Sequence, residues 1–316
     1  MYSGLLIILL PLTFGYLIPI KNKQILHHVH QSLNSMVYVI LFLMGITLAL
    51  LENLSVHLIS ILIYAVTFFA CIFLLNVISL LLLDKLDPWK IPQHKQEKPP
   101  SRLKMVFESL QLCGVLLLGF VVGLTGFDFL HYADKGSQLA LMLLLLLVGI
   151  QLRNSGMSIK QILINRRGTT IAFVMAVSAL AGGALAAFLL GIPVKMGLAL
   201  ASGFGWYSLT GIVLTDAYEP VMGSAAFFND LARELAAIML IPMIINRYRS
   251  TALGICGSTS MDFTLPVLQR SGGVSIVPAV IVHGFVLSLI TPILMVLLYI
   301  GKISVTIAVN LRETGN

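Results

Sequence analysis

Long apolar runs, separated by short polar stretches, are the dominant pattern in this chain of 316 residues. A helix needs about 20 residues to cross a hydrocarbon core of about 30 Å. The runs therefore predict an all-α membrane protein, a polytopic helical bundle with about eight full spans. The expected spans are residues 3–20, 34–51, 56–83, 107–130, 137–152, 169–190, 226–245 and 274–300.

Two further segments are apolar but interrupted. Residues 196–216 contain glycine, serine and threonine, and residues 252–270 contain proline as well. Each glycine weakens a helix by about 1 kcal/mol relative to alanine. Non-helical backbone survives at membrane depth only against protein or a water-filled cavity. We therefore expect two broken or re-entrant segments.

Composition agrees with this pattern, since 58% of the residues are hydrophobic and only 10% are charged. The net charge of +7 comes mostly from short loops after the first, third and fifth expected spans. Basic loops mark the cytoplasmic side of a membrane protein, so this charge indicates topology and no nucleic-acid binding. With eight spans and two re-entrant segments, both termini are expected on the outer, periplasmic side.

A polar stretch and a weak repeat suggest how the chain is organised. Residues 84–106 contain four prolines among charged residues, which predicts a solvated cytoplasmic linker between a three-helix unit, 1–83, and a second unit, 107–316. Residues 42–48 resemble residues 146–152 at an offset of 104. Three spans per unit would invert the second unit, as in many secondary transporters. Short leucine and glycine matches also arise by chance in apolar sequence.

Three charged residues interrupt the apolar run at 226–245. Asp230, Arg233 and Glu234 lie there, with Asn229 beside them. A charge at the bilayer centre costs about 2.5–3.5 kcal/mol on insertion scales, so these residues are candidates for a substrate or proton site. One alternative is an ion pair between Arg233 and Asp230 that locks two helices. Glu234 would then remain as a surplus acid, protonated or bound to a cation.

Other candidate site residues lie in or near the interrupted segments. Trp206, Tyr207 and Ser208 follow two glycines, and the two aromatic rings could wall a substrate or form an interfacial belt. Asp262 stands beside three hydroxyl residues and could be a ligand or a helix N-cap. Glu52 ends the second expected span, where it could mark the membrane interface or face the interior.

Familiar catalytic and nucleotide-binding motifs are missing from the sequence. It contains no P-loop, Gly-x-Ser-x-Gly, HExxH or CxxC motif. We therefore expect no enzyme activity, no cofactor and no metal site.

Four polar blocks together resemble the bacterial lysine exporter family LysO. They are residues 149–154, 202–208, 223–234 and 259–270, and the likeness extends over essentially the whole chain. The resemblance implies an inner-membrane exporter of L-lysine and its toxic analogue thialysine, dependent on two intramembrane acids that correspond to Glu52 and Glu234. The family pattern has Asp at the first position. The family is distantly similar to inverted-repeat transporters with crossed broken helices.

These observations lead to a hypothesis about mechanism. Glu234 and Glu52 would receive the ammonium groups of lysine, assisted by Asp230 or Asp262, and exchange with protons would drive export. N–H groups freed between Gly203 and Gly211 would meet the carboxylate. The alternatives are a sodium/proton or other small-ion antiporter on the same architecture, and a membrane scaffold without transport. The oligomeric state stays open.

Overall fold

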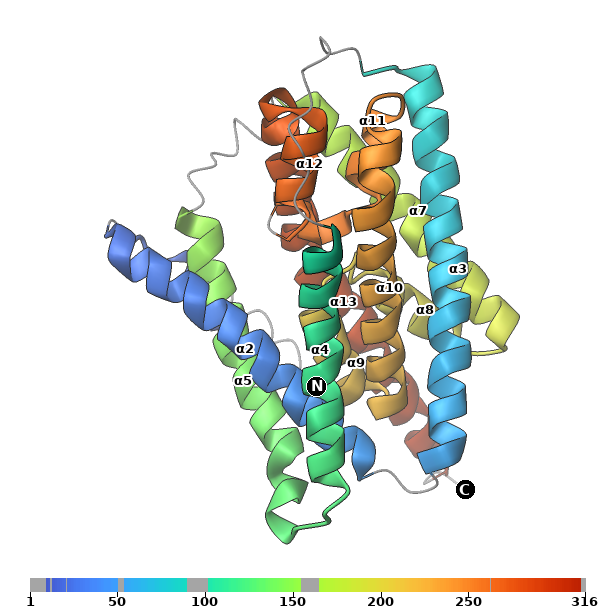
Figure 1. Ribbon diagram of the computed structural model, residues 1–316. Coiled ribbons are helices and arrows are strands. Elements are labelled where there is room, and N and C mark those ends of the chain that lie inside the picture. Colours follow the sequence, from blue (N-terminus) through green and yellow to red (C-terminus); the bar gives the residue numbers. More distant parts are fainter. Residues whose placement is uncertain are drawn as a thin grey trace.

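The computed structural model describes residues 10–11, 13–20, 22–50, 54–89, 102–154, 165–261 and 263–313. Every regular element in these residues is a helix, and the helices form an elongated bundle (Figure 1), which confirms the predicted all-α class. The long helices are α2 (Lys23–Ala49), α3 (Leu54–Leu86), α4 (Arg102–Gly123), α5 (Ala133–Asn154), α7 (Arg166–Leu190), α10 (Pro220–Ile244) and α13 (Val277–Glu313). The short helices are η1 (Asp128–Tyr132), α8 (Val194–Ala201), α9 (Tyr207–Ala217), α11 (Arg249–Gly254), η2 (Gly257–Met261), α12 (Leu265–Gly272) and η3 (Val274–Ile276).

Four helices in the described ranges are long and apolar enough to cross a membrane. They are Gln24–Ala49, His57–Leu86, Arg166–Leu190 and Val277–Leu298. Helix α10 has 25 residues, which is a similar length, but it carries three charged side chains. Helices α4 and α5 contribute shorter apolar stretches, Gly114–Gly123 and Lys135–Gln151. The first half of the expected span at residues 3–20 lies outside the described residues.

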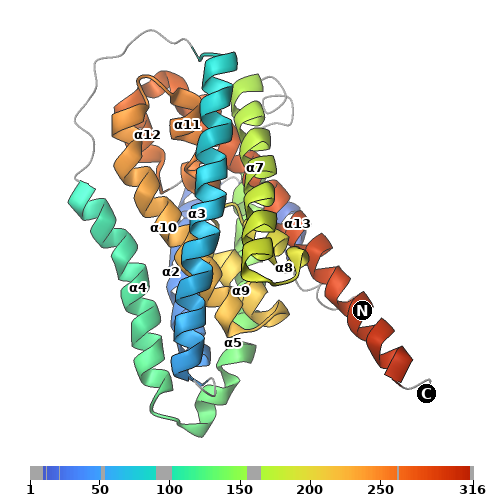
Figure 2. The same cartoon turned by 90° about the vertical axis from the view of Figure 1, so that its right-hand side faces the viewer.

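The helices pack as two groups (Figures 1 and 2). In one group α2 lies along α4 and crosses α5. In the other group α3 packs against α7 and α10, and α13 packs against α7 and η2. The groups meet where α9 and α10 contact α2, α4 and α5. Both interrupted segments belong to the second group.

Glycines allow very close helix contacts in the first group. A Cβ atom added at Gly119 of α4 would collide with the Phe42 carbonyl oxygen of α2. A Cβ added at Gly15, in the helical turn before α2, would collide in the same way with the Leu146 carbonyl oxygen of α5. Small residues are the usual means by which membrane helices bring their backbones together. Gly15 and Gly119 are 104 residues apart in the sequence, and so are Phe42 and Leu146.

Helices α3 and α7 run antiparallel through the second group. The Ser178 hydroxyl donates to Asn76 Oδ1 over 2.6 Å in the buried middle of the pair. At one end Arg167 of α7 forms an ion pair of 2.6 Å with Asp87, just after α3. Gly182 packs against the backbone at Ile72. The end of α3 therefore lies beside the beginning of α7.

The two interrupted segments are broken as the sequence predicts. Helix α8 ends at Ala201 and α9 begins at Tyr207, with Phe204 (φ 48°) and Gly205 (φ 91°) in left-handed conformations between them. Helix α11 ends at Gly254, and Gly257 (φ 59°) begins the 3-10 helix η2. Glycine favours this region because it has no Cβ atom, whereas Phe204 adopts it at a cost.

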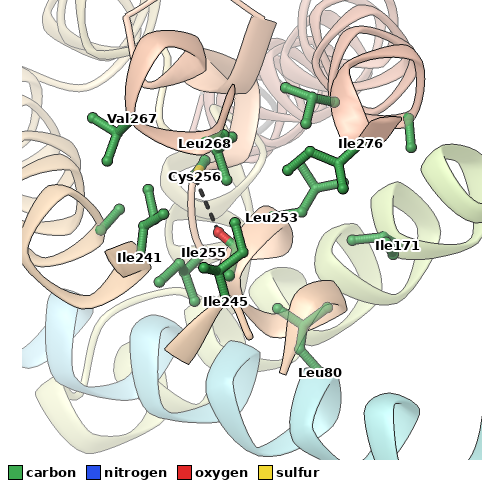
Figure 3. Packing of buried hydrophobic residues seen from close by; sticks show 14 of the residues in the cluster. Leu80, Ile171, Ile241, Ile245, Leu253, Ile255, Cys256, Val267, Leu268 and Ile276 are labelled. Atoms are coloured by element: carbon green, nitrogen blue, oxygen red, sulfur yellow. Dashed lines mark hydrogen bonds between the residues drawn. The ribbon is translucent and has the colours of Figure 1, made fainter. Parts of the chain in front are cut away.

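Helix α11 is only six residues long and is held by apolar packing on all sides. Figure 3 shows Leu253 and Ile255 surrounded by Leu80 of α3, Ile171 of α7 and Ile241 of α10, with further contacts from α12 and η3. The Cys256 thiol donates to the Ala252 carbonyl oxygen over 3.2 Å. Such a short helix is not stable alone, so this cluster fixes its position.

The prediction that the solvated linker starts at Asp84 is wrong. Helix α3 continues to Leu86, and Asp84 is buried. Its carboxylate accepts hydrogen bonds from the Ser250 and Thr251 backbone N–H groups (3.0 and 2.8 Å) and from the Thr251 hydroxyl (2.8 Å). Asp84 thereby caps the N-terminus of α11, whose own N-cap residue, Tyr248, makes no side-chain cap. Residues 90–101 of the expected linker lie outside the described residues.

Candidate functional site

Helix α10 carries the three charged candidates at its middle. At a rise of about 1.5 Å per residue, Asp230 and Glu234 lie roughly 15–21 Å from the start of a helix about 37 Å long. Asp230, Arg233 and Glu234 are 2%, 3% and 0% exposed. All three point into the protein, where charged groups need compensating partners.

The Asp230 carboxylate lies in a polar corner between α10 and α9. The Asn229 side-chain amide donates to Asp230 Oδ1 over 2.8 Å. The Thr210 hydroxyl of α9 lies close to the same carboxylate and donates to the Trp206 carbonyl oxygen over 2.8 Å. Asp230 Oδ2 has no hydrogen-bond partner within the described part of the chain. This carboxylate therefore keeps capacity for a proton or a cation.

Arg233 joins the two interrupted segments. Its NH1 group donates to the Ile255 carbonyl oxygen over 2.8 Å, and its NH2 group donates to the Gly205 carbonyl oxygen over 3.3 Å. The segments also meet directly, because the Ser258 N–H donates to the Phe204 carbonyl oxygen over 2.9 Å. Both hydrogen bonds of the guanidinium run to backbone carbonyls rather than to Asp230. The ion pair with Asp230, which the sequence left open as an alternative, is therefore not the contact that fixes Arg233.

Two glycines make room for this guanidinium. A Cβ atom at Gly205 would occupy the position of Arg233 NH2, and one at Gly257 would meet the Phe204 carbonyl oxygen and Arg233 NH1. Both glycines also have positive φ angles. From the sequence, these glycines are recognisable only as helix breakers, since nothing local to them indicates an arginine from a distant helix.

Glu234 lies one residue beyond Arg233 and is fully buried. It is within electrostatic reach of the buried Cys256, which follows α11. The two acids of α10 are thus enclosed by protein in this conformation. Among the described residues, both side chains are almost fully covered, at 2% and 0% exposure.

The aromatic candidates lie at the start of α9, next to the crossing of the interrupted segments. Trp206 is the N-cap residue of α9 and packs on a cluster that includes Leu209 of α9 and side chains of α2 and α5. The Tyr207 ring meets the Phe227 ring of α10 edge-on, with centroids 5.9 Å apart. Ser208, in the first turn of α9, is buried. All three precede Thr210, which lies close to Asp230, by two to four residues.

His283 of α13 adds a polar group that was not among the predicted site residues. It is fully buried, and its Nδ1 lies 3.0 Å from the Ser260 hydroxyl of η2. The same hydroxyl donates to the Val280 carbonyl oxygen over 3.3 Å. A histidine within an apolar run was the available signal, but its proximity to Arg233 depends on the fold.

Two predicted residues, Glu52 and Asp262, lie outside the described residues, so the structure does not place them. No group of three or more His, Cys, Asp or Glu side chains that could hold a metal ion occurs in the ranges that the structure describes.

Buried acids at mid-helix, beside two interrupted helices, are features of secondary transporters. A membrane transporter is the class that this fold and site define. The family model for the lysine exporter LysO matches residues 113–299. The chain belongs to this lysine exporter family.

Two curated relatives agree with this membership. The chain is 59% identical over 294 residues to the lysine exporter LysO of Escherichia coli (strain K12), which covers 93% of this chain and 98% of the relative. It is 45% identical over 186 residues to a candidate lysine exporter of Haemophilus influenzae (strain ATCC 51907 / DSM 11121 / KW20 / Rd), which covers 59% of this chain and 95% of that protein. No solved structure matches the chain.

Proposed function

We propose that this protein is a secondary transporter that exports L-lysine, and the analogue thialysine, across the bacterial inner membrane in exchange for protons. The observation that carries the proposal is the burial of two acids, Asp230 and Glu234, at the middle of α10. Membership in a lysine exporter family supplies the substrate class.

The charge balance of the site suits a cationic cargo. Lysine at neutral pH carries two ammonium groups and one carboxylate. The two acids outnumber Arg233, and in our proposal they receive ammonium groups, together with Glu52 and Asp262. The cargo carboxylate would approach the first N–H groups of α9, whose N-cap residue makes no side-chain cap.

Proton exchange follows from the energetics of export. Moving one positive charge outward against an inside-negative potential costs about 2.3 kcal/mol per 100 mV. One incoming proton for each outgoing lysine cancels that charge movement. A buried carboxylate that binds either a proton or an ammonium group, but not both, would enforce this exchange.

An inverted repeat would provide the rearrangement that the enclosed acids require. The close contacts of Gly119 with Phe42 and of Gly15 with Leu146 support it, because the offset of 104 residues relates one contact to the other. The same offset relates the end of α3, Leu86, to the end of α7, Leu190. We infer that α2 with α3 corresponds to α5 with α7, in inverted orientation.

The repeat also includes the interrupted segments, but the parts of one repeat unit are not continuous in the sequence. From α8 to α10 the chain forms a half-helix, a glycine-rich break, a second half-helix and a long helix. From α11 through η2 and α12 to α13 the elements follow the same order. Helix α7 leads directly into α8, whereas Asp84 near the end of α3 caps the start of α11. We infer that α11–α13 complete the unit begun by the helical turn at residues 13–16, α2 and α3, and that residues 102–244 form the other unit.

The decisive experiment is counterflow of radiolabelled lysine in proteoliposomes that contain the purified protein. We expect uptake of label against preloaded lysine, and loss of most of it in Glu234→Gln. Glu219→Gln is the matched control, because Glu219 is an exposed glutamate just before the same helix.

Three outcomes would contradict parts of the proposal. Absence of lysine counterflow in the wild-type protein would remove lysine as cargo. Wild-type counterflow in Glu234→Gln would remove this acid from the mechanism. Net lysine efflux that is unchanged after an ionophore collapses the pH gradient would contradict proton exchange, and sodium-dependent pH changes without lysine movement would favour a small-ion antiporter.

A further inference from the structure

The guanidinium of Arg233 is built into the crossing of the interrupted segments. Its two hydrogen-bonded acceptors are the carbonyl oxygens of Gly205, beyond the end of α8, and of Ile255, the C-cap residue of α11. Carbonyl groups at the C-terminal ends of helices lack intrahelical donors and carry partial negative charge. Arg233 supplies donors and positive charge to the C-terminal end of α11 and to the break between α8 and α9 at once.

The surroundings leave this guanidinium little freedom. Gly205 and Gly257 approach it so closely that neither could carry a Cβ atom without displacing it or a neighbouring backbone. The arginine itself is 3% exposed. Binding a mobile cargo group through NH1 or NH2 would compete with these two carbonyl contacts.

We propose that Arg233 is a positioning residue that clamps the two interrupted segments, and that it does not bind the cargo. This inference rests on the proposed function, since it assigns Arg233 a role relative to lysine. Within the described residues, both of its hydrogen bonds run to backbone carbonyls, and neither runs to Asp230. The clamp also fixes the start of α9, and therefore the residues beside the acids.

A rival role for Arg233 deserves a direct test. Its Nε atom has no hydrogen-bond partner in the described residues, so a cargo carboxylate could in principle bind there. Lysinamide separates the two roles, because it keeps both amino groups of lysine but lacks the carboxylate. A residue that binds the carboxylate affects lysine alone, whereas a clamp affects both compounds equally.

The experiment measures thermal unfolding of the detergent-solubilised protein without cargo, and then binding of radiolabelled lysine with lysinamide as competitor. We expect Arg233→Gln to lower the melting temperature and to weaken lysine and lysinamide by the same factor. Arg233→Lys should recover part of both properties, because its ammonium group can still donate to one carbonyl. Arg247→Gln is the matched control, since this exposed arginine lies just beyond the same helix and should change neither property.

Two results would contradict the clamp role of Arg233. Binding a carboxylate would make lysine affinity fall by about tenfold or more in Arg233→Gln while lysinamide affinity stays unchanged, and that would overturn the proposal. A wild-type melting temperature in Arg233→Gln would also overturn it. If Arg233→Gln cannot be purified, the ratio of the two affinities in Arg233→Lys decides. If the wild-type protein binds neither compound, the proposed function fails, and the order of melting temperatures still tests the clamp.

Discussion

Asp84 and Asp230 are both buried aspartates, but their hydrogen bonds differ. The Asp84 carboxylate accepts three hydrogen bonds from the first turn of α11. Asp230 accepts one from Asn229, and its second oxygen has no partner in the described residues. A satisfied buried carboxylate stabilises the fold, whereas a partly satisfied one has a reason to bind a proton or cation. At the scale of single residues, this contrast separates structural charges from candidate transport charges.

Asp84→Ala should destabilise the protein by about 2–3 kcal/mol, because buried N–H groups of Ser250 and Thr251 lose a charged acceptor. Thermal unfolding in detergent measures the effect. Asp87→Ala is the control, since Asp87 is 62% exposed and its ion pair with Arg167 should contribute less than about 1 kcal/mol. Equal melting temperatures for the two variants would contradict the capping role of Asp84.

Glycine and alanine determine which helices can pack closely in the second group. Gly183 of α7 and Gly197 of α8 face each other, and a Cβ atom on either would collide with the carbonyl oxygen of the other. Dispersion contacts drive helix association in lipid, so they depend on such close approach. At the scale of elements, the half-helix α8 is held against α7 because neither side chain intervenes.

Gly183→Ala should therefore destabilise the protein by about 1–3 kcal/mol through overpacking, despite the better helix propensity of alanine. The matched control is Gly114→Ala in α4, where an added Cβ meets nothing within 4 Å. That exchange should stabilise the helix by roughly 0.5–1 kcal/mol. Melting temperatures that move in the same direction for both variants would show that propensity, and not packing, controls these positions.

At the scale of the whole molecule, several basic residues of the described chain lie together at one end. Lys85 at the end of α3, Arg166 and Arg167 at the start of α7, and Arg249 at the start of α11 lie near one another, as the contacts of Arg167 with Asp87 and of Arg249 with the Trp89 carbonyl oxygen show. The interrupted segments enter from opposite ends of the bundle: α11 and α12 lie near the end of α3, and α9 leads into α10 at the other end (Figures 1 and 2). From the positive-inside rule we predict that this basic end is cytoplasmic.

Accessibility of single cysteines tests this orientation and the inverted repeat together. In a background without Cys71, Cys113 and Cys256, we expect a membrane-impermeant maleimide to label Pro193→Cys from outside intact cells. Lys85→Cys should react only in inside-out vesicles. Labelling of both positions from the same side would contradict the inverted arrangement, and exchanged labelling would reverse the topology.

The amino-acid sequence determined the class of this protein because membrane insertion is a local, additive property. Apolar runs must form helices in lipid, since each backbone group needs a partner within its own segment. Glycine-rich interruptions at residues 202–206 and 254–258 were predictable for the same local reason. The cost of three charges in one apolar run also singled out Asp230, Arg233 and Glu234.

Only the tertiary structure decided which groups the buried charged side chains contact. The sequence left an ion pair with Asp230 open as one alternative for Arg233, but the guanidinium donates to the carbonyl oxygens of Gly205 and Ile255. It also placed Asp84 in a solvated linker, although that carboxylate caps a helix 166 residues further along the chain. Backbone groups at helix ends become acceptors or donors only where the fold exposes them. Their partners therefore depend on which distant segments meet, and no local pattern carries that information.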